Sequence, residues 1–211
     1  GSVLKYTGTG KAVVLDASAG VMKSYKSIIK DISIRSVGGT HGIYMKDVAD
    51  ILLENVYVSG TLTDVTATGF TTACIHIDMT PSQASIVVRM LNVYAQACLG
   101  DGVRSGGGNN NNAITIMASR IQGNNGWGIN SLGVTKQMLI VGNDIEGNAL
   151  GGILANAPTN LHIENNYFEY TNPISSIIDV VGGTGGEGIV SIVNNFIQAE
   201  VAFTNGILLG K

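Results

Sequence analysis

The sequence predicts an all-β fold of stacked coils, a solenoid, and the prediction rests on a repeat, on its length and on the composition. The repeat is Asn, any residue, an apolar residue and Glu or Gln, followed after a turn by Gly-Ile. It reads NDIEGNALGGI at 143–153 and SRIQGNNGWGI at 119–129, with weaker copies at Asn55, Asn166 and Asn195. Such a unit is too small to bury a core alone, so neighbouring copies must pack on one another.

The spacing of the repeat sets the number of coils. Its apolar anchors are Ile32, Val56, Val93, Ile121, Ile145, Phe168 and Ile197. Neighbouring anchors lie 23 to 37 residues apart, and the widest gap separates Val56 from Val93. We therefore expect about seven or eight coils of three short strands each, forming one domain over residues 1–211. Gly1-Ser2 resembles a cloning scar, and no polar cap follows the last strand, so we expect a fragment of a longer chain.

The composition agrees with short strands and many turns. Charged residues make up 13% of the chain, against roughly 25% in soluble domains, and Gly occurs 29 times. The net charge is −3 and no segment concentrates Lys or Arg, which argues against a nucleic-acid partner. No apolar run approaches the roughly 20 residues that span a bilayer, so we expect no membrane insertion.

The coil at 137–159 defines the expected elements. Its first strand is 138–141, its second 144–146 and its third 152–155. Gly and Asn stand at the bends between these strands because they tolerate the left-handed backbone of sharp corners. The same division is expected elsewhere, with strands at 51–53, 56–58, 75–77, 161–164, 167–169 and 176–180.

Stacking places equivalent positions of successive coils side by side. Asn143, Asn166 and Asn195 share the position just before the second strand, which predicts an internal asparagine ladder whose amides bond along the stack. Alternation along a strand points Ile75 and Ile77 inward and His76 outward.

The N-x-I-x-G-N…G-I pattern resembles the repeat of right-handed parallel β-helices of the pectate-lyase-like superfamily. The resemblance covers about Val13 to Leu209 and implies the fold more specifically than the function. Members of that superfamily include pectate lyases, polygalacturonases, alginate epimerases, phage tailspike depolymerases and adhesins, and most act on or bind polysaccharide along the outer face. The Gly- and Asn-rich style and the opening TGTGKAVVLDAS resemble a phage tailspike most. This implies a polysaccharide partner, a homotrimer and a location outside the cell or on a virion surface.

Aligning the coils on their third strands gathers ionisable residues in one region. The outward positions of this alignment are Tyr44, His76, Arg104, Asn130, Leu154 and Leu208. Positions nearby add His41, Lys46, Asp78, Asp101 and Trp127. Two loop expansions, at 59–72 and 105–112, flank this region, and inserts in solenoids tend to gather on the binding face.

These residue types suit chemistry on uronic acids. Arg104 would neutralise a substrate carboxylate, while Tyr44 or His76 would remove or donate the proton in β-elimination. A hydrolase would instead need two carboxylates, with Asp78 and Asp101 as candidates.

Residues next to these are expected to bind the substrate rather than to react with it. Trp127 would stack on a sugar ring, and Asn130, His41 and Lys46 would contact the substrate.

Four alternatives remain open. The outward residues are also what any solvated strand face carries, and Arg104 would then simply pair with Asp101. Glu146 and Glu169 follow second-strand anchors in adjacent coils and form another candidate carboxylate pair, about 5 Å apart. A non-enzymatic receptor-binding or shaft segment, and an epimerase-like enzyme, compete with the lyase or hydrolase reading.

Neither a metal nor a cofactor is expected. No run of carboxylates fits a calcium loop, although Asp78 and Asp101 would supply two ligands. Cys74 and Cys98 lack metal-ligand spacing and are interpreted as two small buried apolar residues, with a disulfide left open. Leu132, Leu154 and Leu208 are outward and are expected at a subunit interface.

Overall fold

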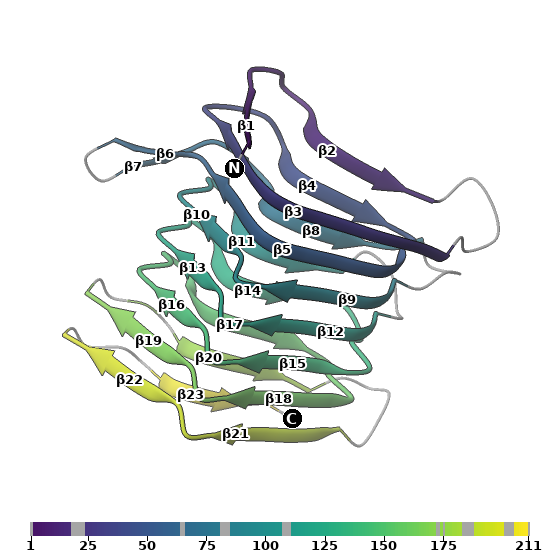
Figure 1. Ribbon diagram of the computed structural model, residues 1–211. Coiled ribbons are helices and arrows are strands. Elements are labelled where there is room, and N and C mark those ends of the chain that lie inside the picture. Colours follow the sequence, from purple (N-terminus) through teal and green to yellow (C-terminus); the bar gives the residue numbers. More distant parts are fainter. Residues whose placement is uncertain are drawn as a thin grey trace.

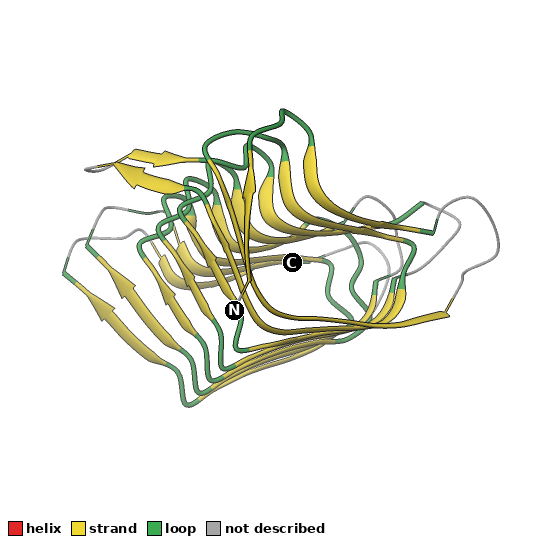
Figure 2. Cartoon of the chain, turned by 45° about the horizontal axis from the view of Figure 1, so that its top comes forward, coloured by secondary structure: helices red, strands yellow, loops and turns green. Residues whose placement is uncertain are grey.

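The computed structural model describes residues 2–17, 24–63, 66–80, 85–106, 111–171, 174, 176–182, 188–200 and 205–210. The chain winds as a parallel β-solenoid of about seven turns, and no helix occurs among these residues (Figure 1). Figure 2, tilted towards the axis of the stack, shows strands of successive turns lying over one another on three faces. The predicted fold class is thereby confirmed.

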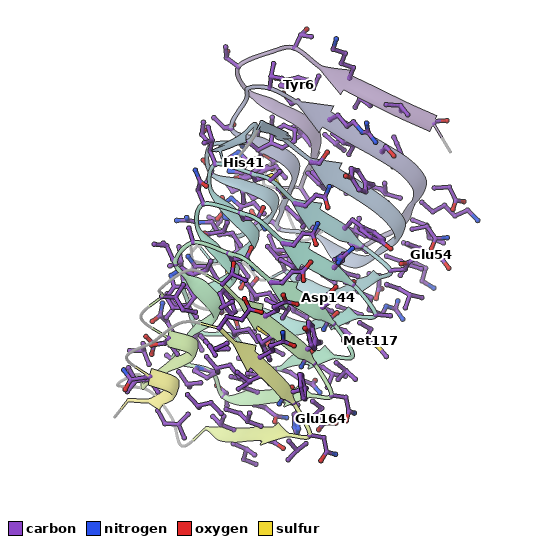
Figure 3. All side chains as sticks on the ribbon, turned by 90° about the vertical axis from the view of Figure 1, so that its left-hand side faces the viewer. Tyr6, His41, Glu54, Met117, Asp144 and Glu164 are labelled. Carbon is purple, nitrogen blue, oxygen red and sulfur yellow. A yellow bond between two sulfur atoms is a disulfide. The ribbon has the colours of Figure 1, made fainter. Side chains whose placement is uncertain are left out.

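The first face is built from the first strand of each turn. Its strands are the first halves of β3 (Ser24–Ser36) and β5 (Ala49–Ser59), then β9 (Ile86–Leu91), β12 (Asn112–Met117), β15 (Met138–Val141), β18 (Asn160–Glu164) and β21 (Ile189–Val193). Figure 3 shows Glu54, Met117 and Glu164 along one edge of this face, at the corner where β5 bends and where β12 and β18 end.

The second face follows the first around that corner. Its strands are β1 (Ser2–Tyr6), the second halves of β3 and β5, then β10 (Tyr94–Gln96), β13 (Arg120–Gln122), β16 (Asp144–Glu146), β19 (Tyr167–Tyr170) and β22 (Phe196–Ala199). β3 and β5 run through the corner without interruption, so the two faces form one 13-stranded sheet. Asn55, at the bend of β5, has φ 52°, the left-handed conformation that Asn tolerates. The separate strands expected at 51–53 and 56–58 are thus one bent strand.

The third face is an eight-stranded parallel sheet. Its strands, in spatial order, are β2 (Lys11–Asp16), β4 (His41–Lys46), β8 (Ala73–Asp78), β11 (Asp101–Ser105), β14 (Trp127–Ser131), β17 (Gly151–Asn156), β20 (Ser176–Val181) and β23 (Asn205–Leu209). The expansion expected at 59–72 contains an antiparallel hairpin, β6 (Thr61–Thr63) and β7 (Thr66–Thr68), which projects from the stack (Figure 1). In the other expansion, 105–112, residues 107–110 lie outside the described part of the chain.

The core fills the interior of the stack. At each inward position of a strand, the equivalent side chains of successive turns stack on one another. Ile43, Ile75, Val103, Ile129 and Ile153 pair in register along the third face and are all buried. The inward positions expected of these five residues are confirmed, whereas Ile207, the last expected anchor, pairs in register with Ile178 but is 44% exposed.

The second-strand anchors need a correction in the early turns. Ala95, not Val93, pairs with Val58 on one side and Ile121 on the other. The repeat anchor of β5 is consequently Val58 rather than Val56, and that of β3 is Ile34 rather than Ile32. A shift of two residues keeps the same side chains inward, because strand side chains alternate with a period of two. Both Val93 and Ala95 are buried, so hydrophobicity did not distinguish them.

The predicted asparagine ladder is present at the corner between the first and second faces. The Oδ1 atom of Asn166 accepts the backbone N–H and the Nδ2–H of Asn143, both at 2.9 Å. Asn195 receives the same pair of bonds from Asn166, and Asn143 receives the backbone N–H of Ser119. These bonds satisfy polar groups that the corner would otherwise bury unpaired.

A second asparagine pair, which the sequence reading missed, supports the corner between the second and third faces. Asn124 donates its backbone N–H and its Nδ2–H to Asn148 Oδ1, at 3.2 and 2.8 Å. Its own Oδ1 accepts the backbone N–H of Cys98 at 3.0 Å. Cys98 forms a disulfide with Cys74, and both are fully buried. The interpretation as two unlinked apolar residues was therefore wrong, because β8 and the corner before β11, on adjacent turns, bring the two Cα atoms to 5.8 Å.

Candidate functional site

The third face carries the residues that the sequence placed there, in the predicted rows. Tyr44 pairs with His76, His76 with Arg104 and Arg104 with Asn130, on the neighbouring strands β4, β8, β11 and β14. Lys46 pairs with Asp78 at the far end of β4 and β8. Neighbouring strands lie about 4.8 Å apart, so this row places a phenol, an imidazole and a guanidinium side by side.

Two imidazoles form a hydrogen-bonded chain across β4 and β8. His76 Nδ1 lies 3.0 Å from His41 Nε2, His76 Nε2 lies 3.4 Å from the Gly106 carbonyl oxygen, and His41 Nδ1 lies 2.9 Å from Thr40 Oγ1. A carbonyl oxygen only accepts, so His76 carries its proton on Nε2. His76 Nδ1 then accepts from His41 Nε2–H, and His41 Nδ1 accepts from the Thr40 hydroxyl.

Both imidazoles are held neutral by their surroundings. Burial lowers the pKa of His41 to about 4, and the nearby His76, Lys11 and Arg104 add to this effect. Burial also lowers the pKa of His76, against the opposing attraction of Asp78. At neutral pH each ring therefore keeps one proton and one lone pair, as the hydrogen-bond chain requires.

Tyr44 closes the same cluster. Its hydroxyl donates to Asp78 Oδ2, and burial followed by this carboxylate raises the pKa of the phenol well above its usual range. The Lys11 ammonium lies 3.1 Å from the centroid of the Tyr44 ring. The ring also meets His76 edge-on at 5.5 Å between centroids. The phenol is thus a fixed proton donor at neutral pH.

Asp101 organises the adjacent turn. Its Oδ1 accepts the Trp127 backbone N–H, and its Oδ2 accepts from Asn130 Nδ2, both at 2.9 Å. Arg104 Nη1 forms an ion pair with the same Oδ2 at 3.2 Å. Burial raises the pKa of Asp101, while these donors oppose the shift. Both carboxylate oxygens of Asp101 therefore accept hydrogen bonds. The ion pair agrees with the alternative in which Arg104 pairs with Asp101.

Asn130 keeps one polar atom free. Its side chain is buried, and among the described residues its Oδ1 has no hydrogen-bond partner. A buried acceptor without a partner is costly. Trp127 is only 8% exposed and its ring packs closely over Gly151 of the next turn. Packing accounts for the indole, and little of its face remains for a sugar.

The outward residues of the third face are less exposed than expected. Tyr44, His76 and His41 are 6%, 9% and 8% exposed, because ring stacking and Lys11 cover them. Arg104, with a side chain 31% exposed, and the half-buried Lys46 and Asp78 remain open to solvent. The patch is therefore a mostly buried polar network with a solvent-facing edge rather than an open surface.

The two carboxylates proposed for hydrolysis are not brought together. Asp101 pairs with Ala73, the first residue of β8, whereas Asp78 is the last residue of that strand. Five residues of extended strand separate these two levels by about 17 Å. Glycosidases need their carboxylates about 5 to 10 Å apart.

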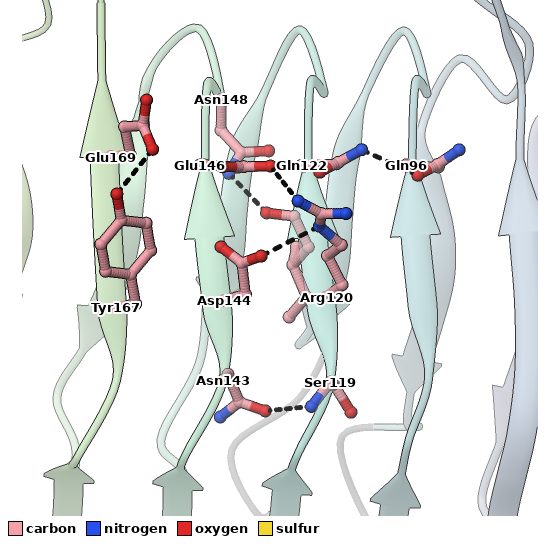
Figure 4. Close-up of polar contacts among 11 residues, drawn as sticks. Gln96, Ser119, Arg120, Gln122, Asn143, Asp144, Glu146, Asn148, Tyr167 and Glu169 are labelled. Carbon is pink, nitrogen blue, oxygen red and sulfur yellow. Dashed lines mark hydrogen bonds and ion pairs between the residues drawn. The ribbon is translucent and has the colours of Figure 1, made fainter.

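The other carboxylate pair lies on the second face (Figure 4). Glu146 and Glu169 pair in register on β16 and β19, as predicted. Glu146 is bound by Arg120 Nη2 at 2.8 Å, and Glu169 accepts the Tyr167 hydroxyl at 2.6 Å. Burial and the neighbouring Asp144 raise the pKa of Glu146, with a smaller contribution from Glu169. A shallow concavity of about 240 Å³ lies over the pair.

Some participants were not singled out from the sequence. Lys11 and Gly106 complete the imidazole and phenol cluster, and Asp179 follows Leu154 in the outward row. Lys11 and Asp179 were in principle detectable, because they hold the same repeat positions as His41 and Leu154. The contact of Gly106 depends on the path of the loop after β11, for which the sequence carries no signal.

Within the described ranges, no three His, Cys, Asp or Glu side chains converge in a metal-ligand arrangement. The described part of the chain also contains no helix long and apolar enough to cross a bilayer.

Comparison with known proteins adds one structural neighbour. No family model matches the chain, and no curated protein matches its sequence. The structure is similar to the A-module of mannuronan C-5 epimerase AlgE6 from Azotobacter vinelandii, with a TM-score of 0.67 over 99% of this chain. The two share 13% sequence identity, and this chain spans 56% of the length of that neighbour. The similarity supports the predicted parallel β-helix architecture, while the likeness to tailspikes stays a prediction.

Proposed function

We propose that this β-helix binds an acidic polysaccharide along the third face and removes the proton at C-5 of a uronate unit. The row Tyr44–His76–Arg104 carries the proposal, because it sets a proton donor, an imidazole and a partly exposed cation on three adjacent strands. The structural neighbour is named for acting at C-5 of mannuronan, which favours the same class of reaction. β-Elimination and C-5 epimerisation both begin by removing this proton, so either outcome fits.

Each residue of the row has a chemical role in the proposal. Arg104 would bind the substrate carboxylate, which makes the neighbouring C-5 proton more acidic. Tyr44, protonated at neutral pH, would turn its hydroxyl from Asp78 to the substrate and donate a proton to the leaving oxygen or to the opposite face of C-5. His76 is neutral, as a base must be, but both of its ring nitrogens are engaged. Its action as a base requires the other tautomer, in which His76 Nδ1–H donates to His41 Nε2, His41 Nδ1–H donates to Thr40 Oγ1, and the Nε2 lone pair takes the substrate proton. Losing the Gly106 contact costs little, because a separation of 3.4 Å makes it a weak hydrogen bond.

Hydrolysis is the less favoured reaction. The separation of Asp78 from Asp101 exceeds the range that glycosidases use. Glu146 and Glu169 have the right spacing, yet one is neutralised by Arg120 and the other is bonded to Tyr167. A non-enzymatic receptor-binding or shaft segment is the second candidate, favoured by the near-complete burial of Tyr44, His76 and His41.

The test uses a panel of polyuronates incubated in D2O. Products are examined by NMR for deuterium at C-5, by ultraviolet absorbance for the unsaturated ends of β-elimination, and by a reducing-end assay. Deuterium or unsaturation supports the proposal, and Tyr44→Phe and Arg104→Lys should then abolish the signal. His162→Gln is the matched control, because His162 lies on the first face. New reducing ends without either signature would indicate hydrolysis, and binding without any product would favour the second candidate.

We further propose an extracellular or virion-surface location and a trimeric assembly. The Cys74–Cys98 disulfide supports the location, since such bonds persist mainly in oxidising compartments. Leu132 and Leu208 are 41% and 39% exposed, which suits burial against neighbouring subunits. Light scattering on the purified protein would give the assembly directly, and a monomer at high concentration would contradict it.

A further inference from the structure

A cavity at the start of the second face lies away from the third-face cluster. Its volume is about 320 Å³, and it is lined by Val3, Lys5, Tyr6, Arg35, Ser36 and Val37. These residues come from β1 and β3 and from the corner that follows them. We call it the β1–β3 cavity. Figure 3 shows Tyr6 in the first turn, above His41 of the next.

Two cations stand side by side at this cavity. Lys5 and Arg35 are register partners on the parallel strands β1 and β3, and both are exposed. Among the described residues, neither forms an ion pair. Like charges directly opposite one another on adjacent strands oppose strand pairing. A bound anion between them would reverse that effect.

The guanidinium is held in a position suited to an anion. Arg35 Cζ lies 5.3 Å from the centroid of the Tyr57 ring, on the next turn of the same face. A planar guanidinium resting on an aromatic ring is oriented before a ligand arrives, and its paired N–H groups match the two oxygens of a carboxylate.

The remaining walls suit the body of a sugar rather than a bare ion. Val3 and Val37, 65% and 70% exposed, give the cavity apolar walls. Tyr6 itself points to the other side of β1, where its ring packs against the core near Phe70 and its hydroxyl accepts the Gly10 backbone N–H at 3.0 Å. Small-ligand sites combine apolar or aromatic walls with a few placed polar groups.

We propose that the β1–β3 cavity is a second carbohydrate site, in which Lys5 and Arg35 bind the carboxylate of a uronic acid unit while its ring lies against Val3 and Val37. The site is distinct from the third-face row, because Lys5 and Arg35 belong to the second face. It rests on the proposed function only for the choice of a uronate as ligand. It would hold an acidic glycan at a point remote from the reaction.

The experiment follows backbone amides by NMR while sodium glucuronate is added at constant ionic strength, with glucose and sodium sulfate as parallel probes. We expect saturable shifts at residues 3–6 and 34–37 with glucuronate, and none with glucose. The double variant Lys5→Ala/Arg35→Ala should weaken binding at least about tenfold, since two charge-assisted contacts are lost. Arg35→Lys should bind with intermediate strength, because it keeps the charge without the planar pair of donors.

The control removes two cations elsewhere. Arg89→Ala/Lys136→Ala has the same net charge as the double variant and alters exposed residues outside the cavity, so its titration should match the wild type. No glucuronate shifts at the cavity, or unchanged shifts in the Lys5→Ala/Arg35→Ala protein, would overturn the proposal. Equal responses to sulfate and glucuronate would also overturn it, as they would indicate a general anion site.

This experiment separates the second site from the proposed reaction. Tyr44→Phe should remove turnover and leave the shifts at 3–6 and 34–37 intact. If no polyuronate is converted but these shifts are present, the second site stands and the proposed reaction fails.

Discussion

The asparagine ladder offers the sharpest test of how the stack is held together, through the substitution Asn166→Ala. The Asn166 side chain accepts two bonds from Asn143 and donates two, to the Ile140 carbonyl at 3.0 Å and to Asn195 Oδ1 at 2.9 Å. Alanine would leave the Asn143 backbone N–H and the Ile140 carbonyl without these partners at a position only 1% exposed. Each of the two buried groups left unpaired costs about 1 to 3 kcal/mol, so we expect a loss of about 2 to 6 kcal/mol.

Urea denaturation followed by circular dichroism measures this loss as a lower midpoint with an unchanged slope. Asn125→Ala is the matched control, because Asn125 is exposed, and it should change the free energy of unfolding by less than about 0.5 kcal/mol. If Asn166→Ala were as stable as Asn125→Ala, the ladder would contribute no net stability and the reasoning would be refuted.

Three further predictions concern stability. Replacing Cys74 and Cys98 by Ala removes a link across 24 residues and should lower the free energy of unfolding by about 3.5 kcal/mol. Thermal unfolding with and without reductant checks this, and reductant should not change the melting temperature of the variant. The pKa of His41 is lowered from 6.5 to about 4, so the neutral form is preferred in the folded state. Stability should be full above pH 6.5 and fall as the pH drops towards 4, and urea midpoints of His41→Gln should show a smaller fall over that window. Gly128→Ala would place a Cβ 2.7 Å from the Gly152 carbonyl oxygen, so we expect a loss of about 2 kcal/mol or more, and an unchanged melting temperature would contradict the close packing of adjacent turns.

Much of the fold was predictable because the corners are marked in the sequence. The strands at 138–141 and 144–146 agree with β15 and β16 to the residue, since Gly142, Asn143 and Gly147 fix the bends. The register of the early turns was not predictable to the same degree. Val93 and Ala95 are two residues apart and both point inward, so only the pairing of the backbones decides between them.

The sequence predicted which residues of the candidate site lie on neighbouring strands, but not how far their side chains are buried. Register alone placed Tyr44, His76 and Arg104 on neighbouring strands, and the structure agrees. The burial of Tyr44 and His76 depends on contacts between turns, such as Lys11 over the phenol and His41 against His76. Spacing in the sequence carries no information on how such side chains cover one another.

The Cys74–Cys98 disulfide could not be predicted from the sequence for a similar reason. Its two residues occupy different positions in the repeat, one in a third strand and one at the corner before the next third strand. Only the three-dimensional offset of adjacent turns brings them together.

The central claim is that the third face removes the C-5 proton of a uronate, and the most direct measurement is NMR of polyuronates incubated with the protein in D2O. The account predicts deuterium at C-5, or a C-4 to C-5 double bond, in at least one polyuronate. It also predicts a loss of about 100-fold or more in Tyr44→Phe and Arg104→Lys but not in His162→Gln. A polyuronate that binds the protein and yet keeps every C-5 proton, without unsaturation, would contradict it.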